Sequence, residues 1–238
     1  MNGFELTQTL STVLGYAGAI LALIALILLA KQHALGQYKS LAAILAFLFL
    51  GSAVGLVMTH LHPINRHLLY EVYFYYFWLG SIVEAILMPI FCYRILTRLF
   101  SSLPDMRSLS TRVFGFLVLV WCARSASFFF MPRMNVSRFL VVEATQLKLL
   151  EGSLSLLTAM VVFVCIRPLR LRLRSPLPAF GLGLIFSAMI VFSSSLFRNS
   201  PQYYFWIAII GGVAICAQLI SWVAAISWSE PAHQVASV

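Results

Sequence analysis

The sequence predicts an all-α, polytopic membrane bundle of seven transmembrane helices. Its 238 residues are 61% hydrophobic and only 10% charged, and the mean hydropathy is +0.95. Stretches of about 18 or more mostly apolar residues are long enough to cross a bilayer as helices. Seven such stretches lie near residues 11–30, 41–59, 70–93, 113–131, 145–166, 179–197 and 203–228. Only short connections separate them, so we expect residues 1–238 to form a single transmembrane domain.

The distribution of Lys and Arg predicts an orientation with the N-terminus outside and the C-terminus inside. In that orientation, ten of the 16 Lys and Arg residues lie in cytoplasmic connections and five in external ones. Basic residues concentrate on the cytoplasmic side of membrane proteins. We therefore expect a multi-pass protein of the inner (plasma) membrane. The fifth connection should contact anionic lipid rather than nucleic acid, through Arg167, Arg170, Arg172 and Arg174.

The first two segments carry small residues on one face. Gly15, Gly18 and Ala22 recur at spacings of three and four in the first segment, and Ala42 and Ala46 do so in the second. Such faces let neighbouring helices approach closely in a bilayer. The first segment lacks a basic leader and is long for the core of a signal peptide. We therefore expect it to be retained as a helix.

The third segment combines an aromatic outer half with an acid near its centre. Tyr73, Tyr76, Gly80 and Glu84 are spaced by three or four residues, which places them on one helical face. A line of tyrosine hydroxyls is therefore expected to lead from the outer surface towards Glu84. Pro89 follows the acid and should bend the helix, because proline cannot donate a backbone hydrogen bond.

The fourth and fifth segments offer partners for Glu84. Arg124 lies near the centre of the fourth segment. At 1.5 Å per residue, Glu84 and Arg124 lie about 3 Å on either side of the bilayer centre, and Glu151 about 8 Å towards the outside. A buried Glu84–Arg124–Glu151 triad is therefore feasible. The fifth segment also carries a polar stripe on one face, formed by Thr145, Lys148, Glu151, Ser155 and Thr158.

The last two segments complete the candidate site. The sixth is rich in Gly and Ser, and the seventh carries Gln218 near mid-membrane. Gln218 needs a hydrogen-bond partner there, and it could line the same cavity as the charged residues. The candidate polar centre thus contains Glu84, Arg124, Glu151, Tyr73, Tyr76 and Gln218, with Pro89 as the kink.

Several functional classes lack their signature residues. The last segment has no Lys for a retinal Schiff base, no segment interior carries His for haem, and the motifs of intramembrane proteases do not occur. His60, His62 and His67 form an external cluster that is expected to be solvated. The four cysteines lie inside predicted helices and imply no disulfide framework. We therefore predict no catalytic, cofactor-binding or metal site, and the sequence favours a protein that is not an enzyme.

In its short connections, its aromatic third segment with a Glu and its basic inner connections, the chain resembles uncharacterised bacterial seven-helix inner-membrane proteins. This resemblance implies no activity. Small seven-helix sugar transporters have a similar length and helix number, but they repeat a proline motif in both halves. Such a repeat is missing here, because Pro89 has no counterpart in a second half.

Three functional hypotheses follow. The first is a non-enzymatic sensor, partner subunit or assembly factor, acting with a membrane protein partner or as a homo-oligomer. The alternative is a small-solute or proton-coupled transporter with Glu84 and Arg124 at its midplane, and a third is an enzyme acting on lipid-borne substrates. Intramembrane charges usually have a function, but a buried ion pair also serves as a structural lock. The sequence leaves both roles open for this pair.

A reporter fused after Val238 tests the predicted orientation. We expect a reporter that works only in the cytoplasm to be active, because the Lys and Arg bias keeps the C-terminus inside. Activity of only an externally working reporter at the same position would refute the N-out, C-in orientation.

Overall fold

The computed structural model describes residues 3–32, 38–61, 66–101, 103–128, 136–169, 176–196 and 204–228. Within these ranges the chain forms seven α-helices, one for each predicted segment, which confirms the all-α prediction for the described residues. The helices are α1 (Gly3–Lys31), α2 (Lys39–Leu61), α3 (Arg66–Leu99), α4 (Pro104–Phe128), α5 (Val136–Cys165), α6 (Pro176–Leu196) and α7 (Tyr204–Ser227).

Several helices extend beyond the predicted apolar segments at their polar ends. α4 begins at Pro104 rather than near residue 113, and α3 continues to Leu99 rather than residue 93. Proline at the first position and an acidic residue in the first turn, here Asp105, both favour the start of a helix. A search for apolar stretches finds only the part of a helix that can lie in the hydrocarbon core. The polar turns at the helix ends were therefore not included in the predicted segments.

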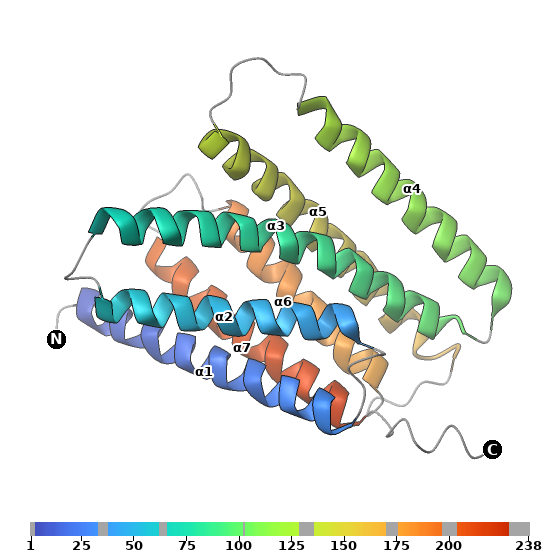
Figure 1. Ribbon diagram of the computed structural model, residues 1–238. Coiled ribbons are helices and arrows are strands. Elements are labelled where there is room, and N and C mark those ends of the chain that lie inside the picture. Colours follow the sequence, from blue (N-terminus) through green and yellow to red (C-terminus); the bar gives the residue numbers. More distant parts are fainter. Residues whose placement is uncertain are drawn as a thin grey trace.

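Successive helices run in opposite directions, so that α1 begins and α7 ends at opposite ends of the bundle (Figure 1). α1 packs between α2 and α7, α6 packs between α5 and α7, and α3 joins α2 to α5. α4 is the exception, because its main contact is with α3 and it diverges from the bundle (Figure 1). At that contact the Tyr93 hydroxyl lies 3.3 Å from Thr111 Oγ1, and the Tyr93 and Phe114 ring centroids are 5.3 Å apart.

Five of the described helices are long and apolar enough to cross a membrane. Their spans are Thr9–Lys31, Phe74–Leu99, Leu140–Cys165, Pro176–Ser194 and Ile209–Ser227. The described part of α2 is apolar over the shorter stretch Lys39–Gly55. Large apolar side chains on these helices point outwards, such as Ile20, Val164 and Ile220, each more than half exposed. A contiguous apolar surface of this kind suits lipid rather than water, so the chain is an integral membrane protein. Seven spans and the orientation stay predictions.

The densest packing fills one half of the bundle, at the end where α3 leads into α4. Here the Phe91 ring meets Phe180 and Trp222 edge-on, with centroids 5.4 Å and 5.7 Å apart. The Tyr38 ring lies 5.5 Å from that of Phe180, and the Arg98 guanidinium donates to the Tyr38 hydroxyl. We call Tyr38, Phe91, Phe180 and Trp222 the aromatic cluster. Tyr38 directly precedes α2, and the other three side chains come from α3, α6 and α7, so the cluster ties the start of α2 to three helices at this end.

Gly183 makes the close packing of α6 on α7 possible. A Cβ atom at this position would lie 2.3 Å from Nε1 of Trp222. The Trp222 side chain is fully buried, so it has no free space into which it could move. Only glycine fits at this point of contact.

We expect Gly183→Ala to lower the free energy of unfolding by about 1–3 kcal/mol, because overpacking a close-packed core forces neighbours out of place. Unfolding in detergent micelles, followed by circular dichroism, measures the change. Gly115→Ala is the matched control: a Cβ there meets nothing within 4 Å, so the better helix propensity of Ala should leave stability unchanged or raised by up to about 1 kcal/mol. Equal destabilisation by both variants would contradict the packing role of Gly183.

Candidate functional site

A cavity of about 600 Å³ lies inside the bundle, next to the aromatic cluster. On α3 its lining residues, 76–84, precede Phe91 along the chain, and on α6 its lining residues, 187–194, follow Phe180. The cavity therefore occupies the middle of the bundle and the half towards the α2–α3 connection, whereas the other half is closed by packing. Ten of its lining residues are polar: Ser52, Tyr76, Ser81, Glu84, Thr145, Lys148, Glu151, Ser187, Ser194 and Gln218.

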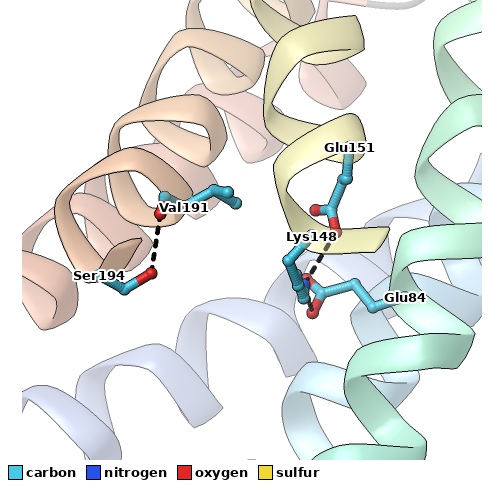
Figure 2. Close-up of polar contacts among 5 residues, drawn as sticks. All are labelled: Glu84, Lys148, Glu151, Val191 and Ser194. Atoms are coloured by element: carbon cyan, nitrogen blue, oxygen red, sulfur yellow. Dashed lines mark hydrogen bonds and ion pairs between the residues drawn. The ribbon is translucent and has the colours of Figure 1, made fainter. Parts of the chain in front are cut away.

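Three charged side chains meet at the wall of this cavity. The Lys148 ammonium on α5 forms an ion pair with Glu84 of α3 and a second one with Glu151, with 2.9 Å between Nζ and Glu151 Oε2. Figure 2 shows Lys148 and Glu84 side by side, with Glu151 above them on the next turn of α5. Lys148 and Glu151 are three residues apart and so share one face of α5. We call Glu84, Lys148 and Glu151 the charged triad.

The members of the charged triad differ in burial. The Glu84 and Lys148 side chains are 21% and 23% exposed, whereas Glu151 is 1% exposed. One oxygen of Glu151 faces Lys148, and the other, Oε1, has no hydrogen-bond partner among the described residues. With both acids ionised, the triad has a net charge of −1. Burying an uncompensated charge is costly, so this site favours a further positive charge.

The structure places two other predicted residues at the same cavity. The Tyr76 hydroxyl donates to the carbonyl oxygen of Phe47 on α2, at 3.3 Å, and the Tyr76 side chain lines the cavity. Gln218 of α7 is 3% exposed and also lines it. The predicted line of tyrosines is described only in part, because the Tyr73 side chain lies outside what the structure describes. Four predicted residues thus share one cavity: Glu84, Glu151, Tyr76 and Gln218.

For the remaining predicted residues the structure does not test the predicted role. Arg124 belongs to α4, but its side chain lies outside the described part of the structure, so the Glu84–Arg124 pair stays a prediction. Pro89 is half-buried inside α3, which continues as a helix to Leu99, and the bend also stays a prediction. His62 lies outside the described residues, as do the side chains of His60 and His67.

Sequence reasoning did not include Lys148 in the polar centre. In the predicted orientation Lys148 is one of the five external Lys and Arg residues, but the structure places it within the span Leu140–Cys165. The signal that could have identified it is the polar stripe, since Lys148 lies one turn before Glu151 on the same face. Because Lys148 lies beside Glu151 on an apolar helix that packs against α3, it can also pair with Glu84 of α3.

The polar stripe of α5 continues past the cavity into the closed half. Ser155 is fully buried and Thr158 is 1% exposed. Both hydroxyls lie close to the sulfur of Cys92 on α3, which is itself buried. Polar atoms therefore extend from the charged triad to the level at which the aromatic cluster begins.

The charged triad predicts unequal effects of removing its members. Lys148→Met should lower the free energy of unfolding by about 3–5 kcal/mol, because it leaves the buried carboxylate of Glu151 and the partly buried one of Glu84 without a partner. Glu84→Gln leaves one acid paired with Lys148 and should cost about 1 kcal/mol or less. Unfolding in detergent micelles measures both values.

The uncharged triple variant Glu84→Gln, Lys148→Met, Glu151→Gln is the control for the loss of side-chain shape. It should recover most of the stability that Lys148→Met loses, because no charge stays buried. If Lys148→Met were no less stable than Glu84→Gln, the Lys148 ion pairs would not hold the site together.

Comparisons with known proteins do not assign the chain to a family. No family model, no curated protein and no solved structure matches it significantly. Its function therefore has to be argued from the chemistry of the cavity.

Proposed function

We propose that this protein carries a small polar solute across the inner membrane and binds it in the cavity beside the charged triad. The cavity carries this proposal: its volume of about 600 Å³ falls in the usual range of small-molecule sites, roughly 300–1,000 Å³. Substrate sites of secondary transporters lie near the bilayer midplane, between helices. Intramembrane charges are costly, and they commonly mark solute or ion pathways.

The buried polar atoms beyond the cavity favour a carrier over a receptor that only binds. A carrier must expose its site to each side in turn, so polar groups are useful on both sides of the site. Ser155 and Thr158 supply such groups in the closed half, on the same face of α5 as Glu151.

Seven spans, an N-out, C-in orientation and a location in the inner membrane belong to the same proposal. In that orientation the cavity lies towards the outside and the aromatic cluster towards the cytoplasm. We also propose contact with anionic lipid at the end of α5, where Arg167 is exposed. Arg170, Arg172 and Arg174 lie outside the described residues.

The cavity changes the order of the functional hypotheses. A sensor, partner subunit or assembly factor stays a prediction, and so does an enzyme of lipid-borne substrates. The transporter hypothesis gains support, with Lys148 in the role that the sequence gave to Arg124.

Labelling of two cysteine variants on α2 tests whether water reaches the cavity from outside. Ser52 lines the cavity, whereas Leu50 is 50% exposed on the outer surface of the bundle. A membrane-impermeant thiol reagent added to intact cells should label Ser52→Cys roughly tenfold faster than Leu50→Cys, since the reactive thiolate forms in water and not in lipid.

The wild-type chain, with its four cysteines, gives the background that is subtracted from both rates. Equal, slow labelling of the two variants in intact cells, and equally in opened membranes, would overturn the water-accessible site. Faster labelling of Ser52→Cys only in opened membranes would overturn the proposed outward orientation of the cavity.

A further inference from the structure

The charged triad restricts the class of solute. The described side chains that line the cavity include three charged ones, two acids and one lysine, so the lining has a net charge of −1 with all three ionised. A positive ligand would balance this excess. A neutral ligand would leave it in place, and an anion would increase it. Because charges interact more strongly in a medium of low dielectric constant, this difference weighs heavily inside a bundle.

The buried acid provides a second, independent observation. Glu151 is 1% exposed and lines the cavity, and its Oε1 lacks a hydrogen-bond partner among the described residues. An unpaired buried carboxylate oxygen costs its full desolvation energy. A ligand with N–H donors would remove this cost.

Lys148 itself shows which donor fits. Its side chain ends in a primary ammonium, which lies between the carboxylates of Glu84 and Glu151 (Figure 2). The spacing of the two acids therefore suits an ammonium head group. A second ammonium in the cavity can share these oxygens, because each carboxylate accepts about four hydrogen bonds.

The remaining lining suits the apolar part of an amine. Tyr76 and Phe77 line the cavity, two turns before Glu84 on its side of α3. Aromatic faces attract cations and pack against hydrocarbon. A bare inorganic ion would fill little of about 600 Å³, whereas an organic amine would occupy both the charged and the aromatic parts.

We infer that the cavity binds a small organic ammonium ion, with its charged head at Glu84 and Glu151 and its apolar part against Tyr76 and Phe77. This inference rests on the proposed solute site and names the class of solute that the site takes.

Thermal shifts of the purified full-length protein in lipid nanodiscs, in an amine-free phosphate buffer, test the inference. The probes are butylammonium, 1-butanol, butyrate and sodium. Butylammonium should raise the melting temperature in a saturable, dose-dependent way, because a ligand stabilises the folded state that binds it. The neutral alcohol, the anion and sodium should not. Protection by sodium alone, by butyrate, or by none of the probes would overturn the inference.

Two pairs of variants test whether butylammonium binds at the charged triad. Glu151→Gln should weaken butylammonium binding by about tenfold or more, as expected when a hydrogen bond to a charged group is lost. Glu143→Gln is the matched control, since Glu143 is a buried acid on α5 that does not line the cavity. Equal dose–response curves for the two variants would show that the amine acts elsewhere and would overturn the inference.

Lys148→Ala should bind butylammonium about tenfold more tightly than the wild type, because the competing internal ammonium is gone and two acids remain. Lys39→Ala, at an exposed lysine outside the cavity lining, should leave binding unchanged. If Lys148→Ala folds only in the presence of butylammonium, and not of butyrate, the amine has replaced the missing lysine, which also supports the inference. A folded Lys148→Ala variant that no longer responds to butylammonium would overturn it.

The experiments distinguish failure of the proposed solute class from failure of the proposed carrier function. If butylammonium fails while Ser52→Cys is still labelled through water, the site stands and its solute belongs to another class. If Ser52→Cys is not labelled and butylammonium gives no shift, both proposals fail.

Discussion

The need to neutralise charge inside a membrane governs the arrangement of this bundle. Glu84, Lys148 and Glu151 lie on helices that otherwise suit hydrocarbon, so their charged groups have to meet. The contact fixes the rotation of α3 and α5 about their axes, because each helix must turn its charged face towards the other. Their apolar faces then point to lipid, as Ile86 and Ile90 of α3 and Leu157 of α5 do.

The same pairing divides the bundle into two unlike halves. Around the charged triad the helices enclose a cavity of about 600 Å³, whereas beyond it the rings of Phe91, Phe180 and Trp222 fill the space between helices. Gly183 permits that packing, since any Cβ there would collide with Trp222. Aromatic rings over glycine close one half tightly, whereas polar side chains surround the cavity in the other half. The proposed carrier would use both features, so this asymmetry supports the function that the cavity suggests.

The polar centre could be predicted from the sequence only in part. Glu84 and Glu151 stood out because charges are rare in apolar helices, and both line the cavity together with Tyr76 and Gln218. The partner of Glu84 was harder to predict. Depth along the bilayer made Arg124 a feasible partner, but depth does not say which helices are neighbours. In the structure α3 packs along α5, while α4 meets α3 mainly near Tyr93 and diverges from the bundle.

What the sequence determined by itself is therefore local: seven helices, an apolar surface suited to lipid, and the faces that carry polar side chains. These features follow from composition and from the helical period, which act within one segment. Tertiary structure decided which faces meet, which lysine neutralises the two acids, and where a cavity stays open. Lipid is as apolar as the helix surfaces, so hydrophobicity does not select neighbours in a bilayer. Close packing at residues such as Gly183 and the pairing of buried charges make that selection, and both depend on the shapes of several helices at once.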